Sequence, residues 1–244
     1  MSRKFLRRTL ALLLCGVASA ALAAPSRVLI FSKTAGYRHE SIPVAVAALQ
    51  RLAAQQMLDS DASEDAGVFT VERLSRYGAV VFVNTTGNVL DDAQQRALRD
   101  FIENGGGFVG VHAAADTEYD WPWYGKLVGA WFLGHPPGLH TTRVHFAQDG
   151  IAPHDREWRV TDELYNYRTN TRRHARVLAT ITEADYSGGT MGADHPIAWC
   201  HELPRRGRAW YTGLGHDAKL YSDPVFLRHL ARGLRYATRL AEEC

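Results

Sequence analysis

Cysteine is scarce in this sequence, which contains three among 244 residues. Cys15 lies in an apolar N-terminal segment that we expect to be removed, which leaves Cys200 and Cys244. These two could pair in an oxidising compartment, so one disulfide is the most that the chain allows. The fold must therefore rest on a hydrophobic core, for which about 220 residues suffice.

Strong net charge is also absent. The chain carries 28 lysines and arginines against 26 aspartates and glutamates, and loss of the four bases near the N-terminus leaves 24 against 26. A nearly neutral protein offers no electrostatic basis for binding nucleic acid or an anionic membrane. No Gly-x-Gly-x-x-Gly fingerprint opens a helix, because Gly105 to Gly107 precede a strand instead of following one. We therefore expect neither a nucleic-acid partner nor a bound nucleotide.

Long hydrophobic runs are limited to one segment, Leu10 to Leu22. Four basic residues precede it and small residues follow it, which is the pattern of a signal peptide over residues 1–23 with cleavage after Ala23. The run is shorter than the roughly 20 residues of a membrane span, so we expect a soluble mature protein with a periplasmic or secreted location. The basic cluster leaves open whether the chain is exported folded or unfolded.

The rest of the chain alternates between strand and helix patterns. Short apolar runs predict buried strands at Val28 to Phe31, Ala79 to Val83 and Phe108 to Val111. Composition and capping residues predict helices over 42–58, 90–104 and 224–240. The acidic stretch 59–67 is predicted to be a loop. This alternation predicts a single α/β domain over residues 24–244, with a doubly wound, mostly parallel sheet flanked by helices.

Polar residues follow each of the predicted strands. Because the carboxyl ends of parallel strands share one edge of a sheet, we expect His39, the segment 84–86 and His112 to converge. His112 follows a glycine-flanked apolar run that places it at that edge. Because histidine gains and loses a proton near physiological pH, its position there indicates a catalytic or ligand-binding role. The alternative is a histidine held in the core by hydrogen bonds.

Six motifs occur in order along nearly all of the mature chain. They are Gly36-Tyr37-Arg38-His39, the run from Gly105 to Tyr119, Trp121-Pro122-Trp123-Tyr124-Gly125, Asp162-Glu163-Leu164-Tyr165-Asn166-Tyr167, Gly192-Ala193-Asp194-His195-Pro196 and Tyr211-Thr212-Gly213-Leu214-Gly215-His216. Together they resemble the ThuA-like (trehalose utilisation) family. The resemblance implies a flavodoxin-like fold similar to class I glutamine amidotransferases, and an association with bacterial metabolism of trehalose and related disaccharides, including 3-keto-sugars.

The similarity to amidotransferases also implies a difference in chemistry. In that superfamily a cysteine nucleophile stands at the turn between strand and helix, and the matching position here is His112. Histidine cannot form the thioester that glutamine hydrolysis uses, and neither Cys200 nor Cys244 lies in such a turn. Glutaminase and cysteine-protease activities are therefore not expected.

Four residues are expected to carry the chemistry. We predict His112 as a base or ligand, His39 and His216 as orienting or electrophilic groups, and Glu163 as their acid–base partner. The same four are candidates for a divalent metal site, although no His-x-x-x-His spacing is present. Because sugars are recognised by aromatic faces and hydrogen bonds, the predicted substrate-binding residues are Thr85, Asp116, Trp121, Trp123, Tyr165, Asn166 and His195. Surface positions are expected for His145, His154, His174 and His229.

These features predict an exported sugar-processing enzyme, a hydrolase or lyase, whose partner is a small-molecule carbohydrate. Ordinary glycoside hydrolysis needs two carboxylates, for which Glu163 is the best candidate, with Asp116 and Glu118 behind it. Elimination from a 3-keto-sugar needs only a base for the C2 proton and a group that stabilises the enolate. Two alternatives remain: a non-catalytic carbohydrate-binding or interaction module on a degenerate amidotransferase-like scaffold, and a subunit that assists a sugar dehydrogenase.

Overall fold

The computed structural model describes residues 27–147 and 157–244. The predicted signal peptide and its cleavage site, and also His154, lie outside the described residues. Within the described residues, no helix is long and apolar enough to cross a bilayer.

The helices and strands, in chain order, are β1 (Arg27–Phe31), α1 (Ile42–Gln55), β2 (Asp59–Ser63), α2 (Val71–Leu74), β3 (Ala79–Val83), α3 (Asp92–Glu103), β4 (Gly107–Val111), α4 (Pro122–Val128), β5 (Phe132–Gly134), β6 (His140–Phe146), β7 (Glu157–Asp162), β8 (Asn166–Tyr167), β9 (Arg176–Ile181), β10 (His195–Glu202), β11 (Arg208–Thr212) and α5 (Pro224–Ala237).

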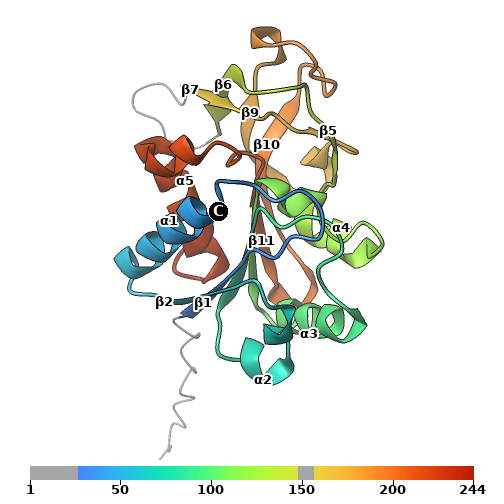
Figure 1. Cartoon of the computed structure of the whole chain (residues 1–244), viewed down its shortest axis with the longest axis vertical. Coiled ribbons are helices and arrows are strands. Elements are labelled where there is room, and N and C mark those ends of the chain that lie inside the picture. Colours follow the sequence, from blue (N-terminus) through green and yellow to red (C-terminus); the bar gives the residue numbers. More distant parts are fainter. Residues whose placement is uncertain (1–26, 148–156) are drawn as a thin grey trace, which may run out of the picture.

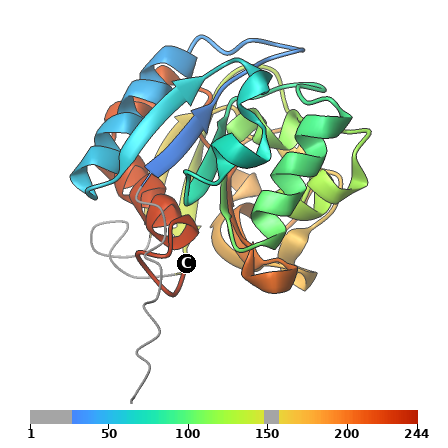
Figure 2. The same cartoon turned by 90° about the horizontal axis from the view of Figure 1, so that it is seen from below.

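Nine of the described strands form one sheet in the order β2-β1-β3-β4-β11-β10-β9-β6-β7 (Figure 1). Pairing is parallel from β2 to β11 and antiparallel from β11 to β7. Helices α1 and α5 pack together on one face, and α2, α3 and α4 cover the other (Figure 2). This arrangement confirms the α/β class with a parallel sheet core flanked by helices. The antiparallel half was not predicted from the sequence.

The central strands are the most apolar and the most buried parts of the sheet. Every residue of β3, β4 and β11 is buried, and β3 and β4 are the continuous apolar runs that strands covered on both faces require. Helix α5 crosses so close to β4 that a Cβ atom on Gly107 would clash with the carbonyl oxygen of Ala237. Glycine is therefore needed where β4 begins, because any side chain there would displace the helix.

The segment after α1 differs from the prediction. Helix α1 ends at Gln55, and β2, which lies inside the stretch predicted as a loop, pairs in parallel with β1. Strand β2 is polar and largely exposed because it forms the edge of the sheet, where one face and one side remain in water. Composition alone therefore indicated a loop.

The last residue of the chain is anchored to the sheet. Cys200, in β10, forms a disulfide with Cys244, and their Cα atoms are 6.4 Å apart, within the range that a disulfide spans. Both cysteines are buried. The segment after α5 is thereby held against β10.

His229 is a buried core residue, which corrects the expectation of a surface position. Its side chain lies on α5, 4.7 Å between ring centroids from Trp210 and 5.4 Å from Phe146. The Nε2 atom has no hydrogen-bond partner among the described residues. Burial, with a smaller contribution from Arg232, lowers the pKa of His229 to about 3. The amphipathic pattern of α5 places this residue on the face that covers the sheet, so helix periodicity outweighs its polarity.

We expect His229→Leu to reduce the loss of stability on acidification. The unfolded chain binds a proton at this residue near pH 6.5, whereas the folded chain does so only near pH 3, so protonation favours unfolding between these values. Protonation of His229 in the unfolded chain lowers the free energy of unfolding by about 2 kcal/mol between pH 7 and pH 5. Urea unfolding at both pH values measures it, with the exposed His174→Leu as control. An unchanged pH dependence in His229→Leu would contradict the assignment.

Candidate functional site

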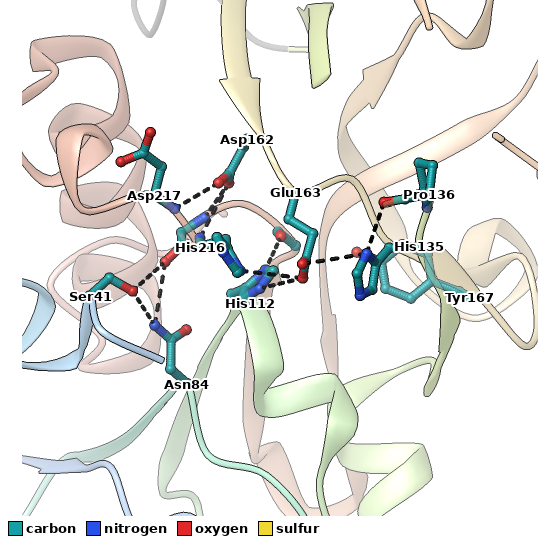
Figure 3. Close-up of polar contacts among 12 residues, drawn as sticks. Ser41, Asn84, His112, His135, Pro136, Asp162, Glu163, Tyr167, His216 and Asp217 are labelled. Carbon is teal, nitrogen blue, oxygen red and sulfur yellow. Dashed lines mark hydrogen bonds and ion pairs between the residues drawn. The ribbon is translucent and has the colours of Figure 1, made fainter. Parts of the chain in front are cut away.

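The centre of the site is His112, which directly follows β4. Its backbone has a positive φ of 49°, a conformation that is costly for a residue with a Cβ and that concentrates at functional turns. The side chain is completely buried, and Nδ1 lies 2.8 Å from the carbonyl oxygen of Gly213, in the loop after β11 (Figure 3). Because a carbonyl oxygen only accepts, Nδ1 carries the hydrogen and Nε2 is left to face the site.

Glu163 follows β7 and points its carboxylate toward three histidines (Figure 3). Its Oε2 atom lies 3.4 Å from Nε2 of His112 and 3.3 Å from Nδ1 of His216. Its Oε1 atom lies 3.4 Å from Nδ1 of His135. The carboxylate is thus surrounded by imidazoles that come from three separate loops.

His39 completes the group from the loop between β1 and α1. Its ring centroid lies 4.9 Å from that of His112 and 5.1 Å from that of His216. Burial, followed by repulsion from His112 and His216, lowers its pKa to about 3, so His39 is neutral at neutral pH. One ligand atom from each of His39, His112, Glu163 and His216 can be chosen so that all four lie within 4.8 Å of one another. We call these four residues the histidine-glutamate cluster.

The electrostatics of the cluster favour an ionised carboxylate. Burial raises the pKa of Glu163, but the contacts and charges of His112 and His216 outweigh burial and hold it well below its usual range. The contact with Glu163 in turn raises the pKa of His216. A buried carboxylate beside imidazoles can relay protons or bind a cation.

The loop that carries His216 is fixed by a second buried carboxylate. Asp162 accepts hydrogen bonds from the backbone N–H of Gly215 at 2.7 Å and of Asp217 at 2.8 Å (Figure 3). From the opposite side, Ser41 and Asn84 donate side-chain hydrogen bonds to the carbonyl oxygen of Gly215. The adjacent residues Asp162 and Glu163 therefore have different tasks: the first positions the loop and the second faces the histidines.

An aromatic wall adjoins the cluster. The ring of Tyr165 lies 4.2 Å between centroids from His112 and 4.2 Å from Phe132, and it is nearly parallel to the ring of His135 at 6.1 Å. Tyr37 is exposed and packs edge-on against His39 at 4.8 Å. Of the predicted aromatic contacts, Tyr165 lies beside His112.

Three other predicted binding residues have structural partners away from the cluster. Thr85 exchanges a side-chain hydrogen bond with Thr117. Asn166 bonds the backbone of the loop at Gly188 and Thr190. His195 donates to the carbonyl oxygen of Tyr165 and contacts Glu183 through its other nitrogen. His195 therefore supports Tyr165 from behind, and the geometry assigns none of the three a place among the cluster residues.

Trp121 and Trp123 lie on a different part of the molecule from the one we expected. Their rings stack on each other at 4.8 Å between centroids, and the guanidinium of Arg99, in α3, lies over both. The indole N–H of Trp123 donates to Glu103 at the end of α3. These rings join α4 to α3. The prediction failed because closeness to His112 in the sequence does not determine which face of the sheet a ring covers.

The remaining predicted residue, Asp116, is half-buried at the end of the short turn that begins at His112. It accepts a hydrogen bond of 2.7 Å from the hydroxyl of Tyr119. Burial is the main cause that raises the pKa of Asp116. The nearby charge of Glu163 also raises it, and His112 and Arg168 oppose the rise. Asp116 therefore lies near the cluster without belonging to it.

Sequence reasoning missed the roles of His135 and Asp162. His135 follows β5 and contacts Glu163, a contact that no motif in the sequence predicts. The position of Asp162 directly before Glu163 gave a signal, because a strand that ends in two acids brings at least one of them to the sheet edge. Neither role follows from spacing alone, because both depend on loops that meet only in the folded chain.

Comparison with known proteins agrees with this architecture. A ThuA-like protein from Bacteroides uniformis ATCC 8492 superposes with a TM-score of 0.72 at 22% identity, covering 91% of this chain and 95% of that one. A ThuA-like protein from Parabacteroides merdae ATCC 43184 gives 0.67 at 20% identity, covering 88% and 90%. A GMP synthase component from Thermoplasma acidophilum gives 0.50 at 11% identity, covering 88% and 98%, which shows a glutamine amidotransferase-like fold.

Sequence comparison gives the family. No curated protein sequence matches this chain. The family model described as ThuA, trehalose utilisation, matches residues 27–237, which is most of the chain and includes the whole histidine-glutamate cluster. The chain therefore belongs to the ThuA family.

Proposed function

We propose that this protein is an exported carbohydrate-processing enzyme, a hydrolase or lyase that acts on a disaccharide oxidised at C3. The observation that carries the proposal is the buried carboxylate of Glu163 among three imidazoles at the carboxyl end of β4. The association of the family with trehalose utilisation supports the substrate class. The positive φ of His112 at the end of a central strand supports a functional role for this turn.

The arrangement of carboxylates favours elimination over ordinary glycoside hydrolysis. Two free carboxylates would have to flank the scissile bond. Among the described residues near the cluster, Asp162 is occupied by backbone N–H groups, and Asp116 by Tyr119. Glu118 accepts from the backbone of Val89 and Leu90. Glu163 is thus the carboxylate that faces the histidines directly.

A 3-keto-disaccharide can be cleaved with histidine chemistry alone. A base removes the proton at C2, which is acidic because it is next to the ketone, and the electron pair forms an enolate at the C3 oxygen. Collapse of the enolate forms the C1–C2 double bond and breaks the C1–O bond, and the departing sugar oxygen takes up a proton. Addition of water across the double bond gives the hydrolysis product, whereas its release without water addition gives the lyase product.

The cluster offers a group for each of these tasks. Nε2 of His112 bears a lone pair that can accept the C2 proton, and Glu163 can pass a proton between substrate and His216. His39, neutral at neutral pH, orients the reacting groups. Tyr37, which is exposed and packs edge-on against His39, offers an aromatic ring for C–H contacts with a sugar, whereas Tyr165 is buried against His112.

Export is supported by features at both ends of the chain. The first 23 residues have the composition of a signal peptide. The disulfide between Cys200 and Cys244 is typical of proteins that fold in an oxidising compartment.

The test is product analysis with the purified chain. We expect 3-ketotrehalose, and not trehalose, to be cleaved, as measured by mass spectrometry and NMR. In D₂O, elimination followed by hydration places deuterium at C2, and incubation of the product alone corrects for spontaneous exchange. Binding of either sugar without turnover would contradict the proposal and favour the non-catalytic binding module.

A further inference from the structure

We propose that the histidine-glutamate cluster is a binding site for one divalent transition-metal ion, held by His39, His112, Glu163 and His216. The site would take an ion that accepts imidazole nitrogen and carboxylate oxygen together, with Zn²⁺ as the representative. This inference goes beyond the proposed function, because it does not depend on which sugar is bound or on whether one is turned over.

The first argument concerns which ring nitrogen of His112 carries the hydrogen. Its only ring hydrogen in the neutral form is committed to the carbonyl of Gly213, so Nε2 presents a lone pair. That lone pair faces Oε2 of Glu163, which is also only an acceptor when ionised, at 3.4 Å. Nε2 has no hydrogen-bond partner with acceptable geometry among the described residues. Two buried acceptors facing each other need a cation between them, either a proton or a metal ion.

The second argument is that two further buried nitrogens of the cluster lack a hydrogen-bond partner. Nδ1 of His216 lies 3.3 Å from Oε2 of Glu163, and within the described part of the chain it also has no partner with hydrogen-bond geometry. Nδ1 of His39 is likewise buried without a partner there. A neutral imidazole can carry its hydrogen on the other ring nitrogen, so each of these three nitrogens can present a lone pair. A metal ion at the centre of the group would accept several lone pairs at once.

The spacing of the atoms fits metal coordination. Two ligand atoms bound to one tetrahedral ion at about 2.0–2.1 Å lie about 3.3 Å apart. The distances from Oε2 of Glu163 to His112 and His216 are 3.4 and 3.3 Å. The four chosen ligand atoms lie within 4.8 Å of one another, so small side-chain rotations suffice to bring them around one ion.

Hydrogen bonds from neighbouring groups orient the cluster residues, as is usual for the ligands of a metal ion. His112 donates its other ring N–H to a backbone carbonyl, which is the common arrangement for a metal-binding histidine. His135 Nδ1 lies 2.9 Å from the carbonyl oxygen of Pro136, so it carries a hydrogen, and it also faces Oε1 of Glu163 at 3.4 Å. Oε2 of Glu163 is thereby left for the ion. Asp162 fixes the backbone beside His216.

The donor set selects the class of ion. Mg²⁺ and Ca²⁺ prefer sites made of oxygen atoms, whereas three imidazoles and one carboxylate suit Zn²⁺, Mn²⁺, Fe²⁺, Co²⁺ or Ni²⁺. In the proposed reaction such an ion would stabilise the enolate oxygen, and His112 would then act as a ligand. The base for the C2 proton would in that case be His135, whose Nδ1–H is committed to the carbonyl of Pro136 and whose Nε2 keeps its lone pair.

The test measures metal binding directly, on the mature chain without a histidine tag. Protein stripped with EDTA is titrated with ZnCl₂ by calorimetry, and with CoCl₂ while the visible absorption of Co²⁺ is recorded. We expect one ion per chain, and affinity lower by about 100-fold or more in Glu163→Gln and His216→Ala. The control His174→Ala, at an exposed histidine, should bind as the wild type does. Circular dichroism shows whether each variant is folded.

The inference is overturned if the wild type binds no ion stoichiometrically, or if folded Glu163→Gln and His216→Ala bind as tightly as the wild type. Its failure can be distinguished from failure of the proposed function. Turnover that persists in metal-free protein without added ions would leave the enzyme proposal standing without the metal. Stoichiometric binding without turnover would leave the metal site standing without the enzyme.

Discussion

Turnover of 3-ketotrehalose is expected to fall by about a thousandfold when His112 is replaced by asparagine, whereas the fold and sugar binding persist. A positioned general base contributes roughly 10²–10⁴-fold to a rate, and a metal ligand at the same atom would contribute comparably. Asparagine suits the position because it tolerates a positive φ and is too short to reach Glu163 in place of the imidazole. Steady-state kinetics gives kcat, and calorimetry with unreacted sugar gives binding.

The matched control for this prediction is His174→Asn, which alters an exposed histidine outside the cluster. It should leave kcat unchanged. If His112→Asn kept a rate within about tenfold of the wild type while folded, the end of β4 would not be the reacting centre. The histidine-glutamate cluster would then be a structural feature of the core.

Replacing Asp162 by alanine is expected to impair both stability and turnover. The substitution leaves the buried N–H of Gly215 and the partly buried N–H of Asp217 without their acceptor, at a cost of about 3 kcal/mol. The loop that they hold carries His216, so this histidine loses its position against Glu163. Urea unfolding measures the first effect, and kcat for the keto-disaccharide measures the second.

Asp162→Asn separates positioning from general destabilisation. An asparagine of the same shape can accept only through its single carbonyl oxygen, so it should recover part of the stability and part of the turnover. A variant Asp162→Ala that is destabilised but keeps wild-type kcat at a temperature where it remains folded would show that Asp162 does not position His216.

Parts of the fold could be predicted because local patterns determine them. Strand β3 has the predicted bounds, Ala79–Val83, since a continuous apolar run covered on both faces has no other arrangement. Helix α3 begins after Asp91, whose side chain caps it as the acidic sequence there indicates. His112 follows β4 directly, as its place after the apolar run predicts.

Other parts depend on contacts between distant segments. The antiparallel half of the sheet needs the pairing of β6, β7, β9 and β10, and no short pattern specifies that register. The face covered by Trp121 and Trp123 is set by α3, far from these residues in the sequence. The contact of His135 with Glu163 depends on two loops whose meeting no spacing reveals.

The position of β11 in the sheet determines the order in which the molecule can be completed. This strand comes late in the sequence but lies in the middle, between β4 and β10. Until residues 208–212 are available, β4 is paired only with β3, and the loop with His216, which follows β11, has no strand to hold it. Closing such long-range contacts carries a large loop entropy and makes folding slow. The sheet of a nascent chain therefore stays incomplete until residues 208–216 have emerged, and the site is among the last parts of this fold to form.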